Sequence, residues 1–109
     1  MELKEFQRSL SAPTPPTGAD KLLQALWHDA KGDWSRAHQI VQSVQGKTSA
    51  RVHAYLHRKE GDLDNANYWH QRAGTTMPTV SLEKEWEMLV KELLAASTVN
   101  DPYPPRSSP

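Results

Sequence analysis

Two arginines and a tyrosine recur at helical spacing in the middle of the chain. Arg51, Tyr55 and Arg58 are separated by four and three residues, so a helix presents all three on one face. Two guanidinium groups beside a tyrosine suit a carboxylate, because each guanidinium can form charge-assisted, bidentate hydrogen bonds with it. The pattern predicts a surface for an acidic or carboxylate-bearing protein or peptide. The alternative is that the arginines are solvated, or form weak surface ion pairs with acids of residues 60–64.

His53 and His57 stand four residues apart on the same predicted helix. At that spacing two imidazoles can share one transition-metal ion. The segment His53-Ala-Tyr-Leu-His57 lacks the glutamate that acts as general base in the HExxH pattern, so the spacing does not by itself predict an enzyme. Histidines at this spacing also occur as hydrogen-bonded residues of helix interfaces, and that interpretation stays open.

Composition excludes several classes of function. Lys plus Arg and Asp plus Glu each number 13, and this balance argues against a nucleic-acid-binding or polybasic membrane surface. Without cysteine there are no disulfides and no thiolate zinc sites. No phosphate-binding glycine loop or nucleophile elbow occurs, so we expect no enzyme and no cofactor. No secretory signal and no apolar run of about 20 residues is present, which predicts a cytoplasmic protein without a membrane span.

The helix that carries these candidate residues belongs to an internal repeat. Gly32-Asp33 and Gly61-Asp62 lie 29 residues apart, and the same shift superposes Ala37 on Ala66. A glycine can end one helix in the left-handed conformation, and the aspartate after it can cap the next. A self-match at a fixed period of this length is typical of repeated helical hairpins. Each Gly-Asp pair is therefore predicted to be a tight turn between two antiparallel helices.

The apolar spacing predicts an all-α fold, and no segment alternates as a strand would. The last helix, beginning after Ser81, has its apolar residues in one stripe and charged residues opposite. The four tryptophans lie beside aliphatic residues at helical spacing, so we interpret them as core. The expected helices span 20–31, 34–45, 48–60, 63–73 and a segment that starts after residue 81. The tryptophans are Trp27, Trp34, Trp69 and Trp86.

The two predicted hairpins resemble tetratricopeptide repeats. That family has a small residue in the first helix, Gly-Asp at the turn, alanine in the second helix and a closing proline. The second unit matches with Ala54, Gly61-Asp62, Ala66 and Pro78. The resemblance covers about residues 19–78 and is divergent, because the period is 29 and most large apolar letters of the pattern are replaced. The segment AYLHRKEGD is also similar to one in small bacterial proteins.

The resemblance implies a right-handed α-α superhelix of two hairpins with a C-terminal capping helix. In this family the first helix of each unit lines a concave groove that holds a peptide. Arg51, Tyr55 and Arg58 would then face that groove, and the chain would act as a protein-binding adaptor or scaffold. Two units are fewer than the three that usually stabilise such stacks, so a homodimer is a further possibility.

The same alignment would bring His70 from the partner helix close to His53 and His57. A metal-binding protein or small hydrolase built on these three histidines is therefore the alternative function, with the missing acid supplied by Asp62 or Asp64.

Proline divides the chain into three parts, since seven of its eight prolines lie before residue 17 or after residue 101. We expect a flexible N-terminal tail over 1–18, a helical domain over 19–97 and a disordered proline-rich tail over 98–109. Within the first tail, the apolar residues Leu3, Phe6 and Leu10 are spaced for a short helix that docks on the core.

Overall fold

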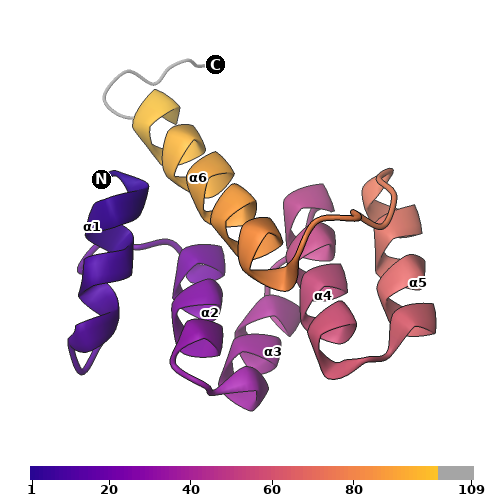
Figure 1. Cartoon of the computed structure of the whole chain (residues 1–109). Helices are drawn as coiled ribbons and strands as arrows, with labels where there is room; N and C mark the ends of the chain where they lie inside the picture. The colour runs from indigo at the N-terminus through magenta and orange to yellow at the C-terminus, as the bar shows by residue number, and fades with distance from the viewer. Residues whose placement is uncertain (101–109) are drawn as a thin grey trace.

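The computed structural model describes residues 1–100, with side chains to residue 96, and all regular structure in that part of the chain is helical (Figure 1). The prediction of an all-α fold is confirmed. Helices α2 to α5 follow one another in a row, and α6 crosses over this row on the side where α1 also lies. The elements are α1 (Leu3–Arg8), η1 (Ser9–Ser11), α2 (Lys21–Ala30), α3 (Trp34–Gln42), α4 (Lys47–Glu60), α5 (Leu63–Ala73) and α6 (Leu82–Asn100).

The two Gly-Asp pairs form the same turn. Gly32 and Gly61 both have φ of +90°, a left-handed conformation that other residues rarely adopt. The amide of Asp33 donates to the His28 carbonyl over 2.9 Å, and the equivalent bond from Asp62 is also 2.9 Å long. Each aspartate then caps the following helix with its side chain. The repeat in the sequence is therefore a repeat in backbone geometry, and it sets α2 against α3 and α4 against α5.

The main core lies between α6 and the helices α1, α2 and α4. Its centre contains side chains with no measurable exposure, contributed by elements that are distant in sequence. Trp86 of α6 extends into it and donates its indole N–H to the Leu26 carbonyl over 2.9 Å. Burying such large apolar side chains is the dominant stabilising contribution in a domain of this size. The fully buried set includes Phe6, Leu26, Val52, Leu56 and Val90.

The N-terminal segment is not the free tail expected over 1–18. Leu3–Arg8 forms α1, and the ring of Phe6 is completely buried at 5.9 Å from the ring of Trp86. Trp27 donates its indole N–H to the Ser9 carbonyl over 3.3 Å, which ties η1 to α2. The folded part begins at residue 3 because an apolar ring at that end fills the core beneath α6.

α6 does not stack beyond α5 as a cap that extends the row. It packs against α1 and against α2 and α4, which are the first helices of the two hairpins (Figure 1). It continues to Asn100, which places residues 98–100 of the expected C-terminal tail in the helix. The remainder of that tail, 101–109, lies outside the described residues. None of the described helices has both the length and the hydropathy that crossing a bilayer requires.

Candidate functional site

His53 and His57 lie on the side of α4 that faces α3 and α5. Both are buried, each with 6% of its surface exposed. One helical turn separates them, and their rings stack with centroids 5.0 Å apart and planes inclined by 21°. The sequence therefore placed these two imidazoles correctly on one face of one helix.

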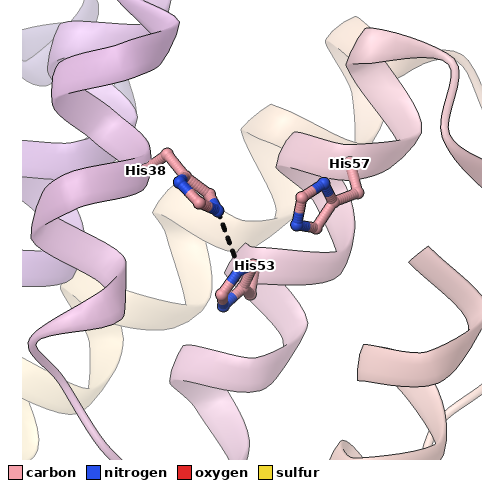
Figure 2. Close-up of side chains that lie close together, drawn as sticks. All are labelled: His38, His53 and His57. Atoms are coloured by element: carbon pink, nitrogen blue, oxygen red, sulfur yellow. Dashed lines mark hydrogen bonds between the residues drawn. The ribbon is translucent and has the colours of Figure 1, made fainter. Parts of the chain in front are cut away.

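A third imidazole, not singled out in the sequence, joins them from α3. His38 Nε2 lies 3.0 Å from His53 Nε2, and its ring centroid is 5.2 Å from that of His57 (Figure 2). One ring nitrogen from each of the three residues lies within 4.8 Å of the other two. We call His38, His53 and His57 the histidine cluster. It spans the junction between the two hairpins, since α3 ends the first and α4 begins the second.

Two tryptophans hold the histidine cluster from either side. The Trp34 ring stacks on His38 at 4.8 Å and 10°, and the Trp69 ring stacks on His53 at 3.9 Å and 11°. Trp34 is itself fixed by an indole hydrogen bond of 2.8 Å to the Leu56 carbonyl. Both indoles are only half-buried; Trp34 still packs against the core, as expected, whereas Trp69 does not belong to it. Their planar faces restrict the rotation of the imidazoles.

A carboxylate orients the third ring. Nδ1 of His57 lies 2.6 Å from Glu60 Oε2, three residues further along α4. With the proton on Nδ1, His57 donates to this carboxylate, and its Nε2 keeps a free lone pair. A carboxylate that accepts from the outer nitrogen is the usual second partner of a metal-binding histidine, because it fixes the tautomer and raises ligand basicity.

The environment keeps His38 and His53 of the cluster neutral near pH 7. Burial first, and the neighbouring imidazoles of His38 and His57 second, together lower the pKa of His53 to about 4. Burial also lowers the pKa of His38, with His57 adding to the effect and Glu60 opposing it. Neutral imidazoles have a free nitrogen lone pair, which is the form that binds metals.

His70 does not join the cluster that the family alignment predicted for it. It faces the other way from α5, where its Nδ1 lies 2.8 Å from Thr75 Oγ1. Its Nε2 is buried and has no hydrogen-bond partner among the described residues. Burial lowers the pKa of His70, so it too is neutral near pH 7. Of the two acids considered as a further ligand, Asp62 belongs to a second, more exposed group. In this group the ligand atoms of His57, Glu60 and Asp62 lie within 4.8 Å of one another.

The predicted partner-binding residues Arg51, Tyr55 and Arg58, which we call the arginine face, all contact the chain itself. Arg51 forms an ion pair with Glu92 of α6. Arg58 is paired with Glu85 at 2.8 Å and donates a second bond to the Val80 carbonyl. The acids of residues 60–64, considered as their surface partners in the sequence, are not the ones they bind. Carboxylates do meet both guanidiniums, and they come from α6.

Tyr55, the third residue of the arginine face, is buried with 2% of its surface exposed. Its hydroxyl donates to Asp29 Oδ2 over 2.9 Å, and Lys59 donates to the other oxygen of the same carboxylate over 3.0 Å. Burial raises the pKa of Tyr55, and the nearby charge of Asp29 raises it further. This tyrosine therefore links α4 to α2, and little of its surface is left for a partner.

Three imidazole nitrogens from two helices form an incomplete metal-ligand set. In tetrahedral zinc sites the Zn–N distance of 2.0–2.1 Å separates neighbouring ligand nitrogens by about 3.3 Å. The 3.0 Å between His38 Nε2 and His53 Nε2 is close to that value. Three protein ligands leave one coordination position for water or another small ligand. Comparison of the chain with protein-family models, curated proteins and solved structures found no match.

Proposed function

We propose that the chain binds one divalent transition-metal ion, zinc or a close relative, through the histidine cluster. The observation that carries this proposal is the convergence of three imidazole nitrogens, from α3 and α4, within 4.8 Å of one another. Imidazole is a donor of intermediate softness that suits Zn²⁺, Cu²⁺ and Ni²⁺. The stacked indoles of Trp34 and Trp69 and the carboxylate of Glu60 support the proposal, because they hold three rings in place before any metal arrives.

The position of the cluster suggests what the metal would do for the fold. We interpret the two hairpins as divergent tetratricopeptide-like units, supported by their matching Gly-Asp turns and small residues. A metal held by His38 from one unit and by His53 and His57 from the other would join them. Binding to the folded state alone at 100 times the Kd would stabilise the protein by about 2.7 kcal/mol.

The direct test is calorimetric titration of the metal-free full chain with Zn²⁺ and Co²⁺. We expect one ion per chain, tight binding and a higher Tm. His38→Ala removes the ligand from α3 and should weaken binding by more than ~100-fold, since loss of a second-sphere partner alone typically costs 10- to 100-fold. His28→Ala is the matched control, because His28 lies on α2 against Trp27 and outside the cluster. Equal affinity in wild type and His38→Ala, with both folded by circular dichroism, would refute the proposal.

One observation also favours a second function, the binding of an acidic protein or peptide. Arg51 and Arg58 already hold two carboxylates of one helix, Glu92 and Glu85. The arginine face is therefore complementary to an acidic helix, and in the isolated chain that helix is α6. An external partner with the same charge pattern would bind by displacing α6.

A labelled peptide of residues 81–96 provides the probe for this second function. It should bind more tightly to full-length Glu85→Gln/Glu92→Gln than to wild type, because the internal competitor is weakened. Arg51→Glu/Arg58→Glu should abolish the binding. If the peptide binds neither the wild type nor the weakened variant, the arginine face serves only to hold α6.

A further inference from the structure

An open groove lies directly beside the histidine cluster. It has a volume of about 750 Å³ and is formed by the end of α3, the start of α4 and one side of α5. His53 belongs both to the cluster and to the wall of this groove. The volume is within the range typical of small-molecule sites, about 300–1,000 Å³. A molecule in the groove therefore lies next to the proposed metal.

The charge of the groove has one sign. Its lining contains two cationic side chains, Lys47 and Arg72, and no acidic residue. The guanidinium carbon of Arg72 lies 5.4 Å from the centroid of the Trp69 ring, whose indole in turn stacks on His53. Lys47 has no ion-pair partner among the described residues. The groove thus presents cations with spare bonding capacity at one end and the histidine cluster at the other.

The rest of the lining is suited to an organic body. Val44 and the half-buried Trp69 provide apolar surface, and Gln42 and Gln45 provide amide donors and acceptors; Val41 and Ala50, which also line the groove, are themselves buried. An inorganic anion such as phosphate would use the cations and leave the apolar wall without contact. An uncharged molecule would leave the charges of Lys47 and Arg72 without a counter-charge, since the contacts of Arg72 are to the Tyr68 hydroxyl and to the rings of Tyr68 and Trp69.

We infer that the groove binds a small organic dicarboxylic acid, with one carboxylate on the open position of the metal and the other at Lys47 and Arg72. This inference rests on the proposed metal binding. Carboxylate oxygens are ordinary zinc ligands, at about 2.0–2.2 Å, and a guanidinium can grip the second carboxylate with two parallel hydrogen bonds. The aliphatic part of the acid lies against Val44, just after the end of α3.

The test uses the Co²⁺-loaded full chain, whose visible absorption reports the ligands of the metal. Succinate, adipate and suberate, which differ in chain length, are titrated while absorption and heat are followed. We expect saturable binding of at least one of them, with a change in the Co²⁺ spectrum. Adipamide, the uncharged analogue, should not bind, and inorganic phosphate should bind at least tenfold more weakly.

Two matched variants separate the groove from general charge. Lys47→Gln/Arg72→Gln should weaken the acid at least tenfold and leave Co²⁺ affinity unchanged, because neither residue is in the cluster. Arg8→Gln/Lys84→Gln removes the same charges from exposed positions outside the groove and should change neither affinity. If Co²⁺ binds but no acid does, or if phosphate binds as tightly, or if the groove variant behaves like its control, the inference is wrong while the proposed metal binding stands. Failure to bind Co²⁺ would overturn both.

Discussion

The two polar faces of α4 are satisfied in opposite ways. On the arginine face, every charged or hydroxyl group meets a group of complementary character from another helix: Arg58 meets Glu85 and Tyr55 meets Asp29. On the opposite face, the histidine cluster brings together three groups of the same kind. Their nearest neighbours are one another, two indoles and the carboxylate of Glu60, with Asp62 close by at the same rim.

The arginine face contributes to the stability of the fold, whereas the histidine cluster carries the proposed metal binding. Complementary partners within one chain lower the free energy of the folded state and leave little bonding capacity for an external ligand. Like groups gathered at a buried site do the reverse, since each lone pair that has no donor remains available to an ion. The sequence suggested the arginine face as the binding surface. In the structure that face is paired largely with α6, whereas on the histidine side His38 and His53 are hydrogen-bonded to each other and His57 to Glu60.

The largest predicted effect is on stability and comes from the arginine face. Arg58→Ala leaves Glu85 as a charge with 7% of its side chain exposed and without its partner. Removing one partner of a buried ion pair typically costs about 3–5 kcal/mol, and we expect about 3 kcal/mol here because Arg58 keeps some solvent contact. Urea unfolding in excess chelator measures this loss. The affinity for Co²⁺ should not change, because the two faces are independent.

The control for this prediction removes both charges. Arg58→Met/Glu85→Met should recover most of the lost stability, since no unpaired charge remains buried. If the double variant is as unstable as the single one, the packing of the arginine stem matters more than its charge. A parallel fall in Co²⁺ affinity would show that the two faces are coupled.

Much of the fold was predictable because its signals are local. The turns at Gly32-Asp33 and Gly61-Asp62 depend on the residues within each turn, and the sequence contains all of them. The position of α6 was not predictable in this way. Its apolar stripe indicates that one face is buried, but a stripe does not specify which helices cover it. The docking of α1 was anticipated from the spacing of Leu3, Phe6 and Leu10, although the proline-rich segment after it favoured a flexible tail over the whole of 1–18.

The histidine cluster was half predictable. His53 and His57 are four residues apart on one helix, so their proximity follows from helical geometry alone. His38 comes from another helix, yet a signal existed, since it lies four residues after Trp34 and three before Val41 on the buried stripe of α3. The family alignment favoured His70 instead.

The second prediction concerns the pH dependence of the metal-free protein. The folded pKa of His53, about 4, is below the unfolded value of about 6.5, so between these values the unfolded state binds more protons. Stability from this residue is complete above pH 6.5 and is lost as the pH falls towards 4. The loss is up to about 3 kcal/mol, since one pKa unit corresponds to about 1.4 kcal/mol.

Thermal unfolding in chelator at several pH values between 4 and 7 measures this effect. His53→Gln keeps a polar side chain but does not titrate in this range, so its Tm should fall less steeply with acid. Identical slopes in the two proteins would show that carboxylates, not the histidine cluster, control acid stability.

The third prediction concerns the carboxylate of Glu60, which contacts His57. Glu60→Ala removes the acceptor of His57 Nδ1 and frees the ring to change tautomer. We expect metal affinity to fall by about 10- to 100-fold with little change in stability, because Glu60 is exposed. Asp64→Ala makes the same charge change on α5 without contacting an imidazole. Equal losses in the two variants would indicate a general electrostatic effect rather than orientation of His57.

The smallest predicted effect tests the exposed end of the arginine face. Arg51 and Glu92 form an ion pair with side chains 26% and 50% exposed, in contrast to the buried pair at Arg58. Water and salt screen such a pair, so a double-mutant cycle with alanine at both positions should give a coupling energy below about 1 kcal/mol. It should decrease further in 0.5 M NaCl, while the coupling of Arg58 with Glu85 changes little. If both couplings were equal and equally sensitive to salt, burial would not be what distinguishes the two ends of this face. The contrast between the arginine face and the histidine cluster of α4 would then depend on charge alone.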